Sequence, residues 1–102
     1  MRVEWSNPAR DDLDDIRRYI SRDSALYAHA LIERILRTTR RLDTFPESGR
    51  IVPEDDTGQT REVIVQGYRV MYGIEPDCVV VLAVISGSRD LSNAALQPWE
   101  QL

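Results

Sequence analysis

Residues 61–85 read REVIVQGYRVMYGIEPDCVVVLAVI, and this stretch decides the fold. Gln66-Gly67 suits a tight hairpin turn, and Glu75-Pro76-Asp77 places proline at the second position of another turn. The strands that these turns separate are predicted at residues 61–65, 68–74 and 78–85. Because connections this short join antiparallel neighbours, the stretch predicts a three-stranded antiparallel meander.

The chain before the meander begins with a strand candidate and then becomes helical. Val3-Glu4-Trp5 is the short strand candidate. Asn7 and Pro8 predict a helix start, because asparagine as N-cap accepts an orphan amide N–H and proline has no N–H to lose at the first helical position. Steps of three and four residues then place an apolar stripe on one side of this helix, formed by Ala9, Leu13, Ile16 and Ile20.

A second helix follows the break at residues 21–24, where Ser-Arg-Asp-Ser supplies new caps. It is expected to end near Phe45-Pro46, because proline disfavours helical geometry in the residue before it. Joined by so few residues, the two helices predict an antiparallel hairpin. Glu33 and Arg37 are spaced for an i,i+4 ion pair. The second apolar stripe comprises Ala28, Ile32, Ile35, Thr39 and Leu42, widened by Leu31 and Leu36.

The length of 102 residues is that of one ordinary domain. We therefore expect a single α+β domain over residues 1–102, in which a short N-terminal strand precedes a two-helix hairpin that packs on one face of the antiparallel sheet. The expected segments are a helical hairpin at about residues 7–45, a loop at 46–60, the sheet at 61–86 and a tail at 87–102.

Composition excludes several classes of protein. The longest uncharged apolar run, Cys78 to Ile85, is far shorter than the roughly 20 residues of a membrane helix. The N-terminus passes at once into charged sequence and has no secretory signal, so a cytoplasmic location is expected. A single cysteine and a single histidine exclude an internal disulfide and a Cys/His zinc site. We expect no cofactor and no metal.

The basic residues are all arginine: there are 13 arginines and no lysine, in a chain of formal net charge −4. Schiff-base chemistry is thereby excluded, whereas the planar guanidinium group suits phosphate or carboxylate. The arginines of the two helices are expected on solvated faces. We expect the sheet to gather several of the other guanidinium groups on one surface that suits a phosphate backbone or an acidic partner. These other arginines are Arg50, Arg61, Arg69 and Arg89.

Several short segments, taken in order, resemble the RelE/ParE superfamily of toxins. They are DLDDI at residues 12–16 with Tyr19-Ile20, FPESGRIVPE at 45–54, REV at 61–63, GYRVMY at 67–72 and SGSRDL at 86–91. The superfamily's layout of strand, two helices and three strands matches the layout predicted above. The resemblance implies a small bacterial toxin of a type II toxin-antitoxin system, held inactive by an antitoxin encoded in the same operon.

The superfamily contains two activities. RelE-like members cut messenger RNA on the ribosome, using lysines on the strand before Gly-Tyr-Arg and a tyrosine or histidine after the final arginine. Here the two strand positions hold Thr60 and Glu62, and no tyrosine or histidine follows Arg89. The resemblance therefore favours the ParE-like branch, which inhibits DNA gyrase without a ribonuclease site, so that no enzymatic activity is expected. A ribosome-dependent endoribonuclease using Arg61, Arg69 and Arg89, and a detoxified antitoxin-binding module, are the alternatives.

Within this interpretation, the arginines outside the helices become candidates for contact with the target. Glu62 is placed to pair with one of them. Tyr68 and Tyr72 share one face of their strand with Val70, and packing is their expected role. The candidates for binding a target or a phosphate are Arg50, Arg61, Arg69, Tyr72 and Arg89.

The third predicted strand is apolar on both alternating faces, as in strands that are covered on both sides. One helical hairpin covers only one side. Either the tail with Leu91, Leu96 and Trp99 or a separate chain must shield the other, and we favour a separate chain, since exposed apolar surface often marks an interface. An antitoxin strand or helix that packs on the sheet would cover this second side. The candidates for antitoxin contact are Val79, Val81, Ala83, Ile85 and Leu91.

Overall fold

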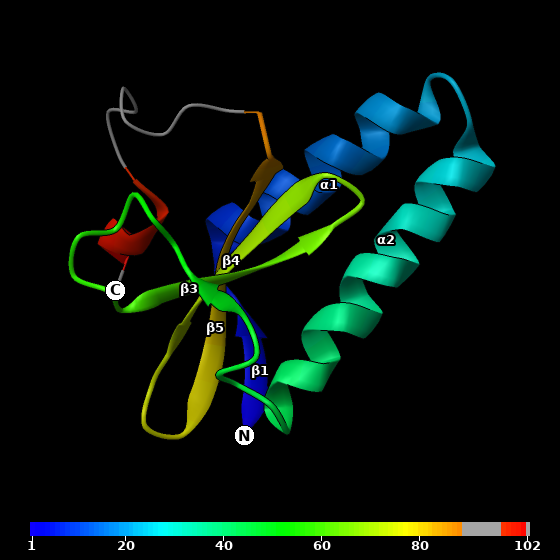
Figure 1. Cartoon of the computed structure of the whole chain (residues 1–102). Helices are drawn as coiled ribbons and strands as arrows, with labels where there is room; N and C mark the ends of the chain where they lie inside the picture. The colour runs from blue at the N-terminus through cyan, green and yellow to red at the C-terminus, as the bar shows by residue number, and fades with distance from the viewer. Residues whose placement is uncertain (89–96, 102) are drawn as a thin grey trace.

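The computed structural model describes residues 1–88 and 97–101. Within them, two helices lie on one face of a five-stranded sheet of order β1-β5-β4-β3-β2 (Figure 1). The predicted antiparallel meander is confirmed as β3, β4 and β5. A short additional strand, β2, lies inside the predicted loop. The strand bounds are Arg2–Trp5 for β1, Arg50–Ile51 for β2, Thr60–Val65 for β3, Tyr68–Ile74 for β4 and Cys78–Ser86 for β5.

The two helices are α1 (Asn7–Ser21) and α2 (Ala25–Arg40), and the short 3-10 helix η1 (Arg41–Asp43) continues α2. The N-cap of α1 is Ser6, one residue before the predicted Asn7, because the hydroxyl of the extended Ser6 accepts the Ala9 N–H at 3.2 Å. Ser24 caps α2 in the same way, as the predicted break suggested. In the described part of the chain, no helix is long and apolar enough to cross a membrane.

The main core lies between the helices and the sheet. The predicted stripe of α1 packs there, with Ala9 completely buried, against Leu31 and Ile35 of α2. Tyr72 of β4 and Leu42 of η1 extend this core. Figure 1 shows both helices on this one side of the sheet, which confirms the predicted layering. The strand residues that face them include Val65, Val70, Val81 and Val84.

The N-terminal strand lies beside the C-terminal one. β1 pairs with β5 in parallel, and Trp5 is opposite Val81. The Ser6 N–H extends this pairing by donating to the Val81 carbonyl at 3.0 Å. β1 therefore enters the sheet at the strand most distant from it in sequence, and the crossover between the two contains both helices.

A β-bulge divides β5 into two parts with opposite side-chain parity. Met71 pairs with Ala83 but the next residue, Tyr72, pairs with Val81, so Leu82 is the extra residue. Before the bulge, Val79 and Val81 face the helices. After it, odd-numbered residues face the opposite side of the sheet, which we call the outer face. Strict alternation would have put the four β5 candidates for antitoxin contact on one face, and the bulge separates Val79 and Val81 from Ala83 and Ile85.

The described chain itself covers an apolar cluster on the outer face. Met71, Ala83 and Ile85 form a buried cluster there with Val52, and Trp99 of the 3-10 helix η2 (Pro98–Gln101) packs against it. The side chain of Gln101 also donates to the Leu82 carbonyl at 2.8 Å. The sequence left two candidates for shielding this side of the sheet, the chain's own tail and a separate chain. For this cluster the tail is the shield, and no separate chain is needed. Leu91 and Leu96 lie outside the described residues.

Candidate functional site

Ion pairs link three strands across the outer face of the sheet. Their centre is Glu62 of β3, whose side chain has no exposed surface. One carboxylate oxygen accepts a hydrogen bond from Arg69 Nε of β4 at 2.6 Å, and the other accepts one from Arg50 Nε of β2 at 2.6 Å. The strand register brings the three side chains together: Glu62 is directly opposite Arg50, and Arg69 is opposite Ile64, two residues along the same face.

Arg69 is enclosed by carboxylates. Its two terminal nitrogens donate to the two oxygens of Glu54 at 2.7 Å each, in a bidentate pairing. Only 5% of Arg69 is exposed. The hydrogen bonds to Glu54 raise the pKa of Arg69 above its usual range; burial opposes this rise, and Glu62 adds to it. The guanidinium therefore stays charged, and a phosphate would have to displace Glu54 to reach it.

Arg61 lies on the opposite face of the sheet from Arg69. The two-residue turn pairs odd-numbered residues of β3 with even-numbered residues of β4, so Arg61 is opposite Tyr72. Its guanidinium donates to the carbonyl oxygens of Gly49 at 2.8 Å and Glu47 at 3.3 Å. The expectation that these arginines gather on one surface is therefore wrong for Arg61 and Arg69, because directly opposite residues share a face.

Tyr72 connects the core to the segment before β2. It has no exposed surface and packs with Leu42 and Val79, in the packing role expected for it. Its hydroxyl donates to the Pro46 carbonyl at 2.7 Å and accepts the Gly49 N–H at 2.9 Å. Burial raises the pKa of Tyr72, which keeps the hydroxyl protonated. Because Arg61 donates to the Glu47 and Gly49 carbonyls of the same segment, Arg61 and Tyr72 together fix the approach to β2.

Arg50 is the most exposed of the candidates that the structure describes. Its side chain is 61% exposed while its Nε binds the buried Glu62. Arg89, the remaining arginine candidate, lies outside the described residues. Within the described part of the chain, no three His, Cys, Asp or Glu side chains converge as a metal site would require. The arrangement therefore holds the segment before β3 against the sheet and presents one exposed guanidinium on it.

Glu54 makes the fold sensitive to acid. Hydrogen bonds from Arg69 hold the pKa of Glu54 below its ordinary value of 4.5, although burial opposes this. Such a carboxylate stabilises the fold above its unfolded-state pKa, and the contribution is lost as pH falls through the lower folded-state pKa. We expect the urea midpoint to fall between about pH 5 and pH 3, and Glu54→Gln to flatten this dependence.

Glu33→Gln is the matched control for this prediction, because Glu33 forms no ion pair among the described residues. Urea unfolding followed by circular dichroism across the same pH range measures both variants. If Glu33→Gln flattens the pH dependence as much as Glu54→Gln does, the role given to the Arg69–Glu54 pair is contradicted.

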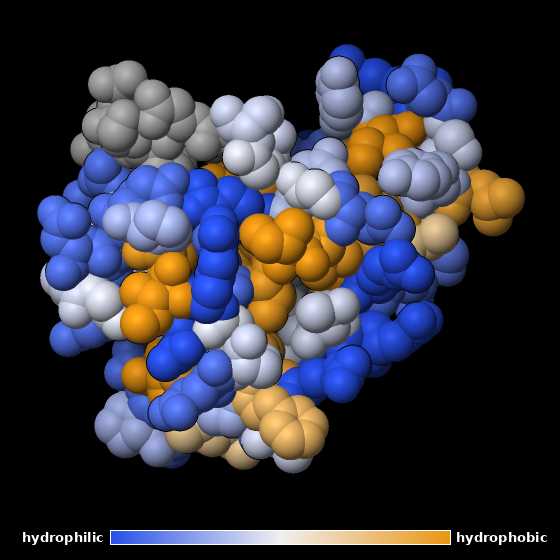
Figure 2. Space-filling model, in the orientation of Figure 1, coloured by the Kyte–Doolittle hydropathy of each residue, from blue (hydrophilic) through white to orange (hydrophobic). Residues whose placement is uncertain are grey.

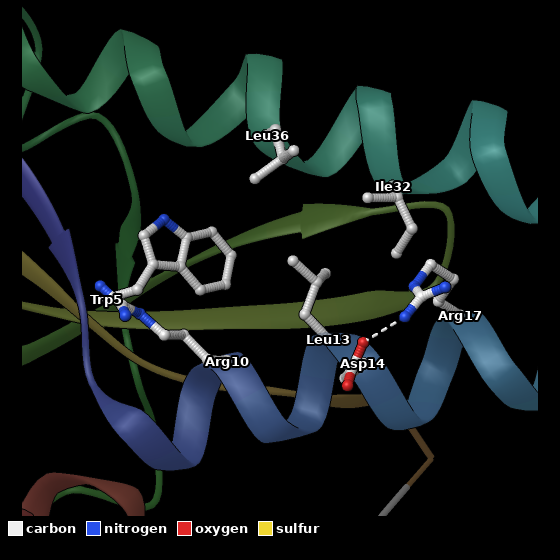
Figure 3. A pocket seen from close by; sticks show the side chains of 7 residues that line it. All are labelled: Trp5, Arg10, Leu13, Asp14, Arg17, Ile32 and Leu36. Carbon is white, nitrogen blue, oxygen red and sulfur yellow. Dashed lines mark hydrogen bonds and ion pairs between the residues drawn. The ribbon is translucent and has the colours of Figure 1, made fainter.

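A hollow of about 220 Å³ lies between the two helices beside β1. Figure 3 shows Leu13 of α1 facing Ile32 and Leu36 of α2 across it. Asp14 on its rim pairs with Arg17, and the hydrogen bond from Arg17 lowers the pKa of Asp14. The hollow is smaller than the roughly 300–1,000 Å³ of typical ligand pockets, so it suits an apolar side chain better than a cofactor. Its lining is Trp5, Arg10, Leu13, Asp14, Arg17, Ile32 and Leu36.

Comparison with known proteins defines the class of this fold and then the family. A solved structure described as "Chromosomal ParDE TA system from P. aeruginosa" matches with a TM-score of 0.71, at 18% identity, over 84% of this chain and 95% of that chain. This match shows a shared fold. Among curated proteins, none matches significantly. The family model "ParE toxin of type II toxin-antitoxin system, parDE" matches residues 3–91. The chain belongs to this ParE toxin family, which confirms the resemblance found in the sequence.

Sequence reasoning identified the arginines of the site but gave Glu54 no partner. The possible pairing of Glu62 with an arginine is confirmed, with both Arg50 and Arg69. A signal for Glu54 was available only in part: a buried bidentate arginine needs a second acid, and the polar segment after Arg50 contains several. The choice among them depends on how that segment folds back over β4.

Proposed function

We propose that this toxin inhibits DNA gyrase in the cytoplasm without cutting RNA, and that a cognate antitoxin neutralises it. The observation that supports this most directly is the state of Arg69. Its guanidinium is bound by Glu62 and Glu54, so the family arginine best placed for phosphate chemistry already has carboxylate partners.

The positions around Arg69 also argue against RNA cleavage. Cleavage requires a base for the 2′-hydroxyl proton, cations for the phosphate and an acid for the leaving oxygen. Thr60 and Glu62, at the two strand positions where RelE-like enzymes carry lysines, are completely or almost completely buried. The Tyr72 hydroxyl is committed to Pro46 and Gly49. These features support a toxin that acts by binding.

Arg50 is the described residue that we propose contacts the target, because its exposed guanidinium is held by a rigid partner. Arg61, Arg69 and Tyr72 then act by positioning the segment that carries Arg50. Arg89 remains a proposed contact outside the described residues. For the antitoxin, Val79 and Val81 are buried in the helix-side core and are poor candidates. Ala83 and Ile85 lie beneath Trp99, so contact with them requires η2 to move.

A gyrase supercoiling assay tests this proposal. We expect excess purified toxin to abolish supercoiling of relaxed plasmid, and primer extension after induction to show no new transcript ends. Arg50→Met is expected to weaken inhibition about tenfold, because it removes an exposed charge at the contact, at a stability cost of about 1 kcal/mol or less. Arg22→Met, on the helical hairpin, is the matched control. Intact supercoiling together with transcripts cut on ribosomes would overturn the proposal.

A further inference from the structure

The hollow between α1 and α2 has an apolar floor. Trp5, Leu13, Ile32 and Leu36 line it, and each of them is only partly buried. Hydrophobic surface also occurs elsewhere, as the patches among hydrophilic side chains in Figure 2 show. An apolar floor therefore does not by itself identify a site, and the rigidity, charge and size of the hollow have to be considered with it.

The walls of the hollow are fixed by the fold. β1 pairs with β5 at Trp5, and the next residue, Ser6, is the N-cap of α1, so Trp5 is held at the start of that helix. Trp5 and Leu13 also pack against the buried cluster of the main core. Figure 3 shows Leu13 and the two α2 residues facing each other beside the Trp5 ring. A group that enters this preformed hollow has little of the protein to order.

The rim of the hollow carries a positive charge that no carboxylate balances. Arg10 lines the hollow, is exposed and forms no ion pair within the described part of the chain. Asp14, one turn further along α1, is the nearest candidate in sequence, but its two oxygens accept hydrogen bonds from Arg17 and Arg18. Figure 3 shows Arg10 extending toward Trp5 at one end of the hollow, away from the Asp14–Arg17 pair. The Arg10 guanidinium is therefore available to an anion.

The volume of the hollow limits the size of its occupant. At the packing density of an organic liquid, 220 Å³ holds about eight non-hydrogen atoms. This is the size of an aromatic ring with a short chain, and much less than a nucleotide or another cofactor needs. Even dry apolar cavities of about 150 Å³ bind benzene, so the hollow has room for one ring.

We propose that this hollow is a binding site for a small amphiphilic carboxylate, whose apolar body packs on Trp5 and Leu13 and whose carboxylate pairs with Arg10. The planar guanidinium can hold a carboxylate through two parallel hydrogen bonds. An aromatic body gains a further contact with the Trp5 ring. The ion pairs of Arg50 and Arg69 lie on the outer face of the sheet, so this site is independent of the function proposed above.

Other small ligands match the hollow less well. A phosphate or a nucleotide would use Arg10 but would leave the apolar floor unfilled. A metal ion or an amine would be repelled by Arg10, and Asp14 is already neutralised by two arginines. A neutral hydrocarbon would fill the floor but would leave Arg10 without a partner. A carboxylate on an apolar body uses both features.

Trp5 allows binding to be measured directly, because it lines the hollow. The chain has two tryptophans, and the other, Trp99, packs on the outer face of the sheet. Trp99→Phe therefore leaves Trp5 as the only tryptophan of the full-length chain. We expect phenylpropionate to change the Trp5 emission with a dissociation constant of about 0.1–1 mM, which is usual for a ligand of this size.

In this background, Arg10→Met is expected to weaken the binding of phenylpropionate about fivefold, because the carboxylate loses its charged donor. The neutral phenylpropionamide should bind about fivefold more weakly than phenylpropionate when Arg10 is present, and equally well when it is not. Arg40→Met is the matched control, since Arg40 is also exposed and without an ion pair among the described residues but does not line the hollow. We expect it to change the affinity less than about twofold.

Ile32→Phe tests the hollow itself, because the larger side chain occupies part of its volume. We expect phenylpropionate to bind this variant at least about fivefold more weakly. Thermal melting verifies that each variant is folded.

Three outcomes would overturn the inference: Trp5 emission that phenylpropionate leaves unchanged up to about 10 mM, equal affinities for phenylpropionate and its amide, or equal losses for Arg10→Met and Arg40→Met. A tenfold preference for a capped glutamyl-leucine dipeptide over phenylpropionate would also overturn it, in favour of a side chain of a partner protein. Because gyrase is absent from these measurements, their result and that of the supercoiling test are judged separately.

Discussion

Replacing Arg69 with methionine is expected to lower the free energy of unfolding by about 3–5 kcal/mol. The substitution removes the principal partner of Glu62, which has no exposed surface, and leaves Glu54 without its bidentate donor. A buried carboxylate without its main counter-charge is costly because little water reaches it. For a domain of this size the melting temperature should fall by about 15 °C or more. Urea unfolding and thermal melting followed by circular dichroism measure both quantities.

Arg50→Met is the control for this result, because Arg50 binds the same carboxylate from an exposed position. Its expected cost is about 1 kcal/mol or less. If Arg69→Met proves too unstable to purify, Arg69→Met combined with Glu62→Gln should recover part of the stability, since the uncompensated buried charge is removed. Equal costs for Arg50→Met and Arg69→Met would contradict the central role given to Arg69.

Replacing Gly49 with alanine is expected to cost about 3 kcal/mol, at the upper end of overpacking substitutions. An added Cβ would lie 2.6 Å from the Glu62 carbonyl oxygen and 2.6 Å from the Tyr72 hydroxyl. Neither neighbour moves freely, because one is sheet backbone and the other donates to Pro46. A shift of Gly49 itself would weaken the bond from Arg61 to its carbonyl. Chemical denaturation at neutral pH measures the loss.

Two related variants test whether the close contact at Gly49 is the cause of the expected loss of stability. Tyr72→Phe should not rescue Gly49→Ala, because the contact with the Glu62 carbonyl remains. Gly58→Ala is the control: an added Cβ there meets no atom within 4 Å, and only the backbone φ of 71° opposes it, at about 1 kcal/mol. A Gly49→Ala variant within 1 kcal/mol of the unaltered chain would show that the segment before β2 moves aside.

Most of the secondary structure could be predicted because it follows from local signals. The bounds predicted for β4 agree with the structure, because the residue types in Gln66-Gly67 and Glu75-Pro76-Asp77 favour turns at both ends of the strand. The start of α1 was misplaced by one residue because Ser6 and Asn7 are both good N-caps. The two-residue β2 left no periodic signal at all, being too short for one.

The candidate site was harder to predict, because its geometry depends on pairing between distant residues. The arginine set was recognised from residue type, but the face of each arginine depends on the strand register. Arg61 and Arg69 separate because β3 residues pair with β4 residues of opposite parity. The bulge at Leu82 separates Val81 from Ala83 in the same manner. A shift of one residue in the strand register moves every side chain beyond it to the other face of the sheet.

The sequence by itself determined the helices, the meander, the absence of lysine chemistry and the membership of a toxin superfamily. The helices and the meander depend on periodicity and turn residues, and the absence of lysine chemistry on composition, all of which are local; the superfamily was recognised from the resemblance of short segments in their order along the chain. Only the tertiary structure decided that Arg69 is bound by Glu62 and Glu54, and that Trp99 packs against the buried cluster on the outer face. The physical reason is that an ion pair or a hollow requires groups far apart in the chain to meet, and the packing of the elements alone decides which of them do.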